Sequence, residues 1–392
     1  MPPAARIVRS LAMDVFSIPR STGDRRRVVT MTERTARRPL VAVVVTALVL
    51  VAALAGGWWA SAQVDSRGAP LVRLASLVPA DVHTVNLTDW AGIRDALGEG
   101  GTAEQRSDLV ATAQTRDLSS RSVVSPSAEL LDELFGWAPW SIGWEAFVQT
   151  PTGGALIISL PESQSMRDLA DRLTEVGYER AGGDGDVQRW TIDSAPLRAA
   201  GLAGEGVFTR LAVVPGERIA VSAVDDASVD RVLAVIDGRA PALAGEPLAA
   251  DVLAPLRKAV TVLAQTEEFA CGPADPAGVG EDARAQADAA LARTGPLTPY
   301  RWSARAVADD GDEQQMTFAF GFDTAGVAAE QAAVRQGLAT GPFIGRTGRV
   351  DDALRDGTAA LRGTTAVLTF DRAPDSAVLM TGTGPVLFAA CR

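Results

Sequence analysis

The sequence contains little of the residue types on which most enzymes rely for chemistry. Its 392 residues include one histidine, two cysteines and a single lysine against 36 arginines. Metal sites, thiol catalysis and Schiff bases draw on the three scarce types, so most sites of those kinds are excluded. No G-x-S-x-G, H-E-x-x-H, C-x-x-C or phosphate-loop motif is present. We therefore expect no metal and no cofactor, and the pattern favours a protein that is not an enzyme.

A long run without charge is the strongest single feature that is present. Residues 39–64 contain no charged side chain, and Leu40 to Trp59 are almost wholly Val, Ala and Leu, ending in Gly-Gly-Trp-Trp. A bilayer core of ~30 Å needs about 20 apolar residues in a helix, and Trp58 and Trp59 fall at the expected interface. The sequence predicts a transmembrane helix over residues 39–62.

The charges on either side of this run predict its orientation. Residues 1–38 hold nine arginines and three acidic residues, a net charge of +6, so the remainder carries −17 of the total of −11. The positive-inside rule then keeps this arginine-rich tail in the cytoplasm and exports the rest. An exported part of such negative charge lacks the basic face that nucleic acid requires, so we expect no nucleic-acid partner.

A cleaved signal peptide is the alternative to a retained anchor. Ala60-Ser61-Ala62 fits the small-residue cleavage pattern, and Met31 offers a second start codon. The apolar run is longer than the ~7 to 15 residues of a signal core, which favours an uncleaved, single-pass anchor in the cell membrane.

The exported part reads as alternating short strands and helices, which predicts an α+β fold with antiparallel sheets. Hairpins are expected around Pro151–Gly154 and Pro215–Gly216, each followed by a helix-period segment. The same order recurs further on, which indicates two similar halves, residues 63–240 and 241–392. Gly238 to Pro247 form the expected boundary.

The distal half contains the clearest strand pattern. Gln314 to Phe322 are predicted to pair with Arg301 to Ala308 across an acidic turn. Apolar side chains alternate in the second of these strands, which predicts that one of its faces packs into the core. Those side chains are Met316, Phe318, Phe320 and Phe322. Two further strands are expected to close the chain, Thr365 to Phe370 and Ala377 to Thr381, the second continuing as Val386 to Ala390.

Tryptophans cluster just before the first hairpin and form the candidate ligand site. Exposed aromatics at this density stack on sugar rings or bind a partner, whereas buried ones only fill the core, and the core interpretation is favoured here. Glu145 beside them is the one candidate glycosidase acid, although no second acid lies opposite it in the pattern. The candidate ligand-binding residues are Trp137, Trp140, Trp144 and Glu145.

The acidic turn of the distal hairpin is a candidate calcium site. Asp309, Asp310, Asp312 and Glu313 surround Gly311, and four carboxylates supply oxygen ligands. The spacing differs from that of an EF-hand, so the pattern favours a solvated turn.

The two cysteines are predicted to form a disulfide. Cys271 and Cys391 both lie on the exported side, where oxidising compartments favour pairing, and two cysteines allow only one intramolecular bond. Two buried free thiols are the alternative.

The N-terminal part of the chain also resembles a known group of proteins. The anchor, the segment Leu77-Val-Pro-Ala-Asp81 and the helix start Thr88-Asp89-Trp90 resemble uncharacterised single-pass exported proteins of high-GC Gram-positive bacteria. The resemblance implies location at the cell membrane, with a cytoplasmic N-terminus, and implies no activity.

Three functions remain open from the sequence. The first is a non-enzymatic envelope protein that binds another envelope protein or a wall polymer. The second is a carboxylate-dependent cell-wall hydrolase using Glu145. The third is an envelope sensor or regulator whose arginine-rich tail meets a partner or anionic lipid.

Overall fold

The structure is a computed structural model that describes residues 69–98, 102–182, 186–274, 280–380 and 386–391. The predicted transmembrane helix of residues 39–62 lies outside these ranges. Within the described residues, no helix combines the length and the apolar character that crossing a bilayer requires.

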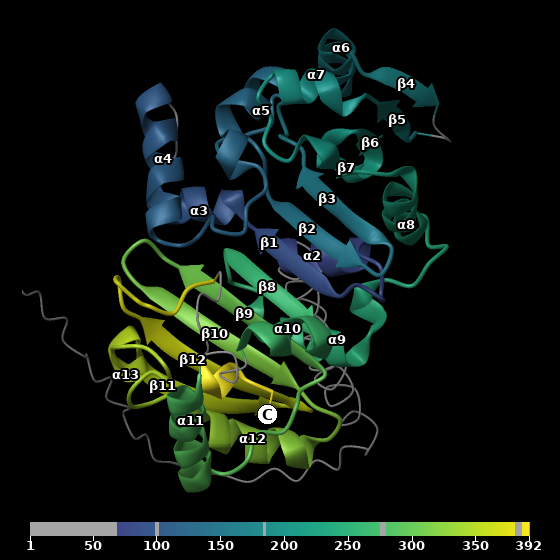
Figure 1. Ribbon diagram of the computed structural model, residues 1–392. Helices are drawn as coiled ribbons and strands as arrows, with labels where there is room; N and C mark the ends of the chain where they lie inside the picture. The colour runs from purple at the N-terminus through teal and green to yellow at the C-terminus, as the bar shows by residue number, and fades with distance from the viewer. Residues whose placement is uncertain (1–68, 99–101, 183–185, 275–279, 381–385, 392) are drawn as a thin grey trace, which may run out of the picture. The chain divides into compact units, whose positions relative to one another are not determined.

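The described residues form a mixed α+β fold that is built around one large antiparallel sheet (Figure 1). The strand order is β11-β12-β10-β9-β8-β1-β2-β3-β7-β6-β5-β4. The pair β1–β8 in the middle joins the strands that precede residue 240 to those that follow it. The strands are β1 (Thr84–Thr88), β2 (Glu145–Thr150), β3 (Gly153–Ser159), β4 (Glu179–Gly182), β5 (Gln188–Thr191), β6 (Arg210–Val214), β7 (Ile219–Ala223), β8 (Thr261–Thr266), β9 (Trp302–Asp309), β10 (Gln314–Gly321), β11 (Leu354–Arg362) and β12 (Thr365–Arg372).

The helices pack on the two sides of this sheet. One side carries α2 (Pro70–Leu77), α8 (Asp226–Ile236) and α9 (Pro247–Leu253), whose buried side chains share a core with one face of the strands. The other side carries two groups of helices, which share a second core with the opposite face. These are α3 (Trp90–Leu97), α4 (Ala103–Thr115), α5 (Ala128–Phe135), α6 (Met166–Val176) and α7 (Ser194–Ala199) over the proximal strands, and α10 (Glu267–Ala274), α11 (Glu281–Thr294), α12 (Ala325–Leu338) and α13 (Val350–Ala353) over the distal ones.

Local sequence signals explain where several elements begin and end. Asp89 accepts a hydrogen bond from the backbone of Gly92 and caps α3, which ends at Gly98. Thr102 and Gln105 form a reciprocal capping box at the start of α4. The turn between β2 and β3 contains only residues 151–152, so the predicted hairpin is confirmed.

The apolar face of β10 is buried, as the alternation predicts. Met316, Phe318, Phe320 and Phe322 are each at most 3% exposed and belong to one core. Arg335 of α12 is fully buried beside them, and its guanidinium lies 4.5 Å from the centroid of the Phe320 ring.

Of the two strands expected to close the chain, the first is present as β12, and the second, with its continuation, is wrong. Residues 377–380 are not a strand, because Met380 donates its backbone N–H to Asp117 Oδ2 rather than to a neighbouring strand. Residues 387–389 form a 3-10 turn. The distal edge of the sheet is instead β11, a strand without an apolar alternation in its sequence.

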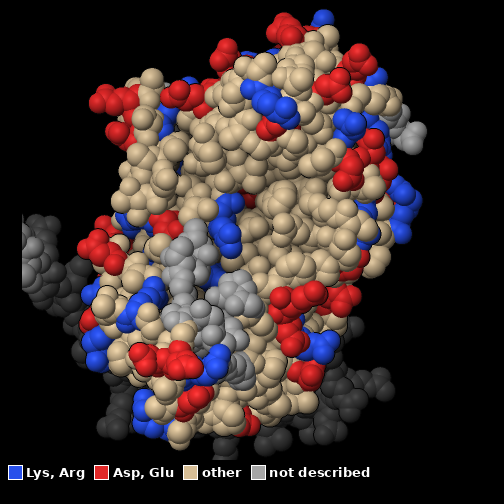
Figure 2. All heavy atoms as spheres, viewed as in Figure 1, with Lys and Arg blue, Asp and Glu red and all other residues tan. Residues whose placement is uncertain are grey.

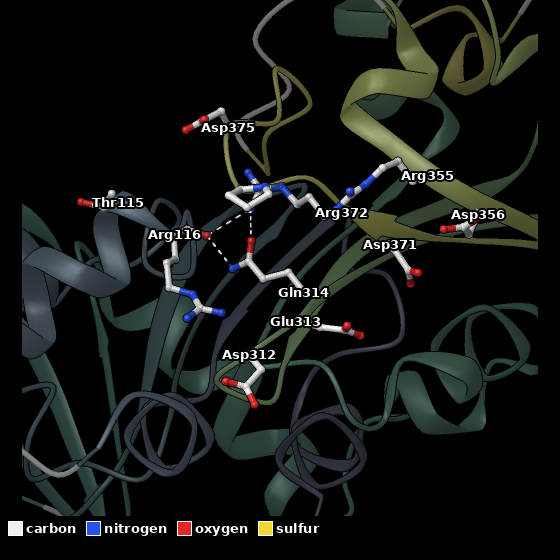
Figure 3. A pocket seen from close by; sticks show the side chains of 11 residues that line it. Thr115, Arg116, Asp312, Glu313, Gln314, Arg355, Asp356, Asp371, Arg372 and Asp375 are labelled. Carbon is white, nitrogen blue, oxygen red and sulfur yellow. Dashed lines mark hydrogen bonds between the residues drawn. The ribbon is translucent and has the colours of Figure 1, made fainter. Parts of the chain in front are cut away.

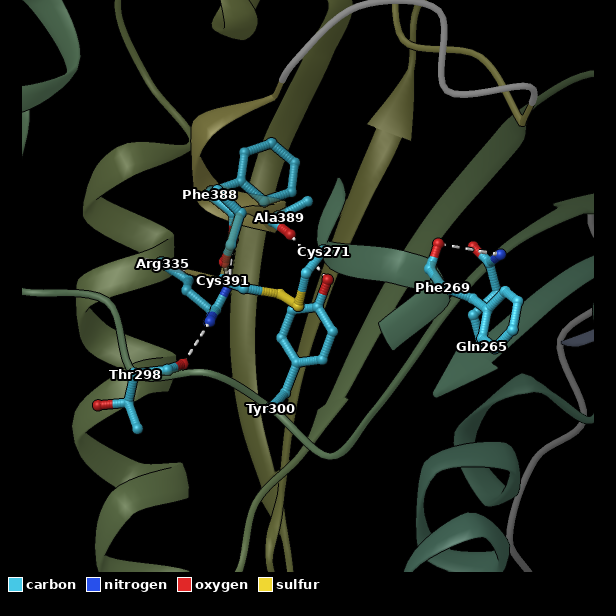
Figure 4. Close-up of a disulfide and its surroundings, with 10 residues drawn as sticks. Gln265, Phe269, Cys271, Thr298, Tyr300, Arg335, Phe388, Ala389 and Cys391 are labelled. Carbon is cyan, nitrogen blue, oxygen red and sulfur yellow. Dashed lines mark hydrogen bonds between the residues drawn. A yellow bond between two sulfur atoms is a disulfide. The ribbon is translucent and has the colours of Figure 1, made fainter. Parts of the chain in front are cut away.

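The predicted disulfide is present (Figure 4). Cys271 of α10 is bonded to Cys391, with 5.3 Å between their Cα atoms and 120 residues between them in sequence. The adjacent chain end is held as well: Arg335 donates to the carbonyls of Phe388 and Ala390, and Tyr300 donates its hydroxyl to Ala389. The bond therefore ties the last turn to the core of the distal part.

Candidate functional site in the middle of the sheet

The three tryptophans of the predicted ligand site do not share a surface. Trp137 is fully buried, its ring lies 4.9 Å from that of Phe135 in a tilted arrangement, and it donates to Gln164. Trp144 is 4% exposed and packs in the core on the opposite side of the sheet. Trp140 is half-buried and donates to Asp132. Two of the three therefore fill separate cores, which matches the core interpretation favoured for them.

Glu145 is buried and fully engaged in hydrogen bonds. Its Oε1 accepts from Trp90 Nε1 at 2.8 Å and from the hydroxyl of Ser122. Its Oε2 accepts from the backbone N–H groups of Val123 and Val124, at 2.9 and 3.1 Å. Burial raises the pKa of this carboxyl, and the four hydrogen bonds act against that rise. Glu145 thus fixes the segment of residues 122–124 against the start of β2.

The middle of the sheet is covered unequally on its two sides. Facing α2 and α9, the side chains of Val85, Leu87 and Val262 are at most 1% exposed. On the other face, a cross-strand row runs through residues that lie opposite one another in register. We call these residues the central row: Phe147, Asn86, Leu263 and Arg305. All but Leu263 remain partly exposed.

Figures 1 and 2 show one side of the molecule. In Figure 1 the middle of β2 and β3 is open to the viewer between the helices at either end. Figure 2, from the same side, shows a hollow near the middle of this face with Lys and Arg atoms beside it. A partly exposed row of polar and apolar side chains on a sheet face between helices is a typical setting for a ligand.

Two arginines of the described chain are poorly satisfied by hydrogen bonds. Arg305 makes one marginal hydrogen bond of 3.5 Å, from Nη1 to the carbonyl of Leu379, and the Nε atom of Arg121 is buried without a hydrogen-bond partner among the described residues. Burial, followed by the nearby charge of Arg121, lowers the pKa of Arg305 to about 10, against the opposing effects of Tyr300 and Asp117. Burial also lowers the pKa of Arg121. Both remain cations near pH 7.

A buried polar network connects the segment after α4 to the distal strands. Asp117 Oδ2 accepts from Arg372 at 3.2 Å and from the backbone of Met380 at 2.7 Å. Arg372 also donates to Gln314 and to the carbonyl of Arg116 (Figure 3). The two partners of the Asp117–Arg372 pair are nearly inaccessible, which identifies the pair as part of the structural framework.

A charged pocket of about 500 Å³ lies beside this network (Figure 3). Five acidic and three basic side chains line it, so their charges largely oppose one another: Asp312, Glu313, Asp356, Asp371 and Asp375 with Arg116, Arg355 and Arg372.

The acidic turn behind this pocket is only partly solvated. The side chain of Asp309 is inaccessible and pairs with Arg116 at 2.8 Å, whereas Asp310 is exposed and accepts from two backbone N–H groups of its own turn. Among the described residues, no group of three or more histidine, cysteine or acidic side chains is placed to hold a metal ion.

Comparison with known proteins gives no family. No protein-family model matches the chain, and no curated protein matches it. Two crystal structures of TP0453 match at 8% and 7% identity with TM-scores of 0.35 and 0.36; each alignment covers 76% of this chain and 92% of TP0453. The candidate site is therefore defined by the geometry of this chain.

Proposed function

We propose that this chain is a membrane-anchored protein of the cell envelope whose exported domain binds a partner and catalyses no reaction. In this proposal residues 1–38 lie in the cytoplasm, residues 39–62 span the membrane and the rest is extracytoplasmic. The Cys271–Cys391 bond supports an exported location, because disulfides persist mainly in oxidising compartments.

The order of the elements supports two similar halves in this exported part. In each half a helix, α2 or α9, precedes a central strand, β1 or β8, and helices, a hairpin and a further helix follow that strand. A later strand, β7 or β12, then pairs with the second strand of that hairpin. We infer that residues 63–240 and 241–392 are two copies of one arrangement, related across the β1–β8 pair.

The observation that carries the proposed function is the exposed central row. Sheets of this kind cover their faces with helices or present one face to water with polar side chains. Here helices cover both ends of one face but leave Phe147, Asn86 and Arg305 partly exposed between them. An aromatic ring, an amide and a guanidinium on one sheet face supply the mixed contacts that binding sites use.

The buried state of Glu145 supports binding rather than hydrolysis. A glycosidase acid must exchange a proton with its substrate and must lie across the bond from a second carboxylate. Both oxygens of Glu145 are instead occupied by donors of this chain, and the side chain is inaccessible to a substrate. The hydrogen bonds that Glu145 accepts from residues 122–124 give it a structural role, which is to hold this segment in place.

The test is retention of an envelope component by the full chain, solubilised from membranes of its native host. We expect an envelope protein or a wall polymer to co-purify with the wild type and to fall at least about 10-fold with Phe147→Ala, since central aromatic contacts contribute about 2 kcal/mol or more to binding. Val224→Ala, at a side chain 61% exposed elsewhere, is the matched control and should retain the component fully. Equal retention by both variants, or turnover of wall material by the wild type, would contradict the proposal.

A further inference from the structure

The two edges of the sheet differ in how well they are protected against pairing with another strand. An edge presents unpaired backbone N–H and C=O groups, and natural edge strands are usually short, charged or irregular. Edge strand β4 has all three features: it contains four residues, Glu179 and Arg180 are charged, and its register shifts between Arg180 and Gly182. Edge strand β11 is nine residues long, and eight of them are exposed.

Only the first half of β11 is irregular. Its register with β12 shifts between Arg355 and Thr358, and Asp356 in this stretch has a φ of 52°. Residues 358–362 then pair with β12 without interruption, up to the turn at residues 363–364. Their sequence is Thr-Ala-Ala-Leu-Arg, which contains neither proline nor lysine and has its one charge at the end. We call residues 358–362 the open edge.

The hydrogen bonds of β12 show which backbone groups of the open edge are unpaired. Phe322 donates its backbone N–H to the carbonyl of Thr364 at 2.9 Å, so Thr364 and every second residue after it direct their backbone groups towards β10. The residues between them bond the open edge, where their partners are Thr358, Ala360 and Arg362. Ala359 and Leu361 therefore direct their N–H and C=O groups outwards, where no described residue bonds them.

The open edge is complementary to itself in one antiparallel register. When Ala360 of two copies meets on a two-fold axis, Ala359 of each copy lies opposite Leu361 of the other. These two form hydrogen-bonded pairs, which use every outward N–H and C=O group of the open edge. Their apolar side chains meet on one face, and Arg362 lies opposite Thr358, so no like charges oppose one another. Shifting the register by two residues sets some of these groups against the turn or the irregular stretch instead.

The length of the open edge also favours a second copy over a longer foreign strand. The irregular stretch bounds it at one end and the hairpin turn at the other, so a second open edge matches it residue for residue. Such a contact is smaller than the interface of a typical stable dimer, so it requires a high local concentration. Anchoring of both copies in one membrane, as proposed above, supplies that concentration.

We propose that this chain forms a homodimer through its open edge, which joins the sheets of two copies into one continuous antiparallel sheet. The contact is distinct from the central row. Strands β10 and β12 lie between β11 and the nearest member of that row, Arg305 on β9.

Cysteine trapping tests the register of the dimer. In the two-fold arrangement the Ala360 residues form a non-hydrogen-bonded pair with about 4.5 Å between their Cα atoms, a separation that a disulfide spans. The two copies of Thr358 lie about 13 Å apart along the strands, which is too far for a bond. The native cysteines are bonded to each other, so an introduced cysteine is the one free thiol of the variant. The full chain in neutral detergent, treated with a mild oxidant, should give at least about 10-fold more covalent dimer with Ala360→Cys than with the equally exposed Thr358→Cys.

A second substitution tests the outward hydrogen bonds. Leu361→Pro removes an N–H that β12 does not use, and edge strands tolerate proline at such positions. Added to Ala360→Cys, it should abolish the covalent dimer without lowering the melting temperature of the chain appreciably. Retention of the envelope component should persist in Leu361→Pro, because the central row is unchanged.

Three results would each overturn the proposal. They are the absence of covalent dimer from Ala360→Cys, equal yields from Ala360→Cys and Thr358→Cys, and an undiminished yield when Leu361→Pro is added. If the envelope component is still retained in any of these cases, the binding function stands and only the dimer fails.

Discussion

Replacing both cysteines, as Cys271→Ser with Cys391→Ser, is expected to lower the free energy of unfolding by about 3 to 5 kcal/mol. The bond closes a loop of 120 residues, so its loss returns much conformational freedom to the unfolded chain. The last turn then loses its covalent link to α10 and keeps the hydrogen bonds that it accepts from Arg335 and Tyr300. Chemical denaturation followed by far-UV circular dichroism measures the difference.

The matched control for the double variant is the wild type under reducing conditions, which should unfold at the same denaturant concentration. A reductant that leaves the midpoint of the double variant unchanged while lowering that of the wild type confirms that the bond is responsible. Identical unfolding of oxidised wild type and double variant would show that the bond is absent from the folded protein in solution.

Phe320→Ala is expected to destabilise the protein by about 3 to 5 kcal/mol, the usual effect of deleting a buried Phe side chain. The ring is 1% exposed, lies 5.2 Å from the Tyr300 ring and 4.5 Å from the Arg335 guanidinium, measured to its centroid. Truncation leaves a cavity in the distal core and removes an aromatic contact of a buried cation. Calorimetric melting should show a large fall in the midpoint.

Phe269→Ala provides the matched control, because the same deletion is made at a ring 38% exposed that stacks on His83. We expect a loss of less than about 1 kcal/mol there, as for other surface substitutions that keep the fold. Equal effects of the two variants would mean that β10 does not bury its apolar face.

The sequence was most informative where one period runs through a whole element. The four apolar side chains from Met316 to Phe322 alternate without interruption, so their common burial follows from strand geometry alone. Helix α3 can equally be recognised from the sequence, since Asp89 and Gly98 mark its two ends. The hairpin turns at Pro151 and Pro215 carry the residues that such turns demand.

Strand β11 carried no such signal. Eight of its nine residues are exposed, so neither face shows an apolar alternation. Its register shifts between Arg355 and Thr358, where Asp356 has a φ of 52° and Gly357 lies against the Phe370 ring. An irregular edge strand of this kind is recognisable only once its neighbour β12 is in place.

The candidate site was hidden for a different reason. Phe147, Asn86 and Arg305 are far apart in sequence, and only the sheet register brings them into one row. A hint was nevertheless present in Ser303-Ala-Arg-Ala-Val307, where a long cation alternates with alanines in a predicted strand. The tryptophans instead indicated a ligand site, because an aromatic cluster has the same sequence pattern whether it is buried or exposed.

The central claim is that the ligand occupies the middle of the sheet, and site-specific photo-crosslinking in the native host tests it most directly. A photoreactive phenylalanine analogue placed at Phe147 lies in the central row, and the same analogue at Val224, 61% exposed, is the matched position outside it. We expect a discrete crosslinked product from position 147 and none from position 224. No product from position 147, or the same product from both positions, would contradict the account.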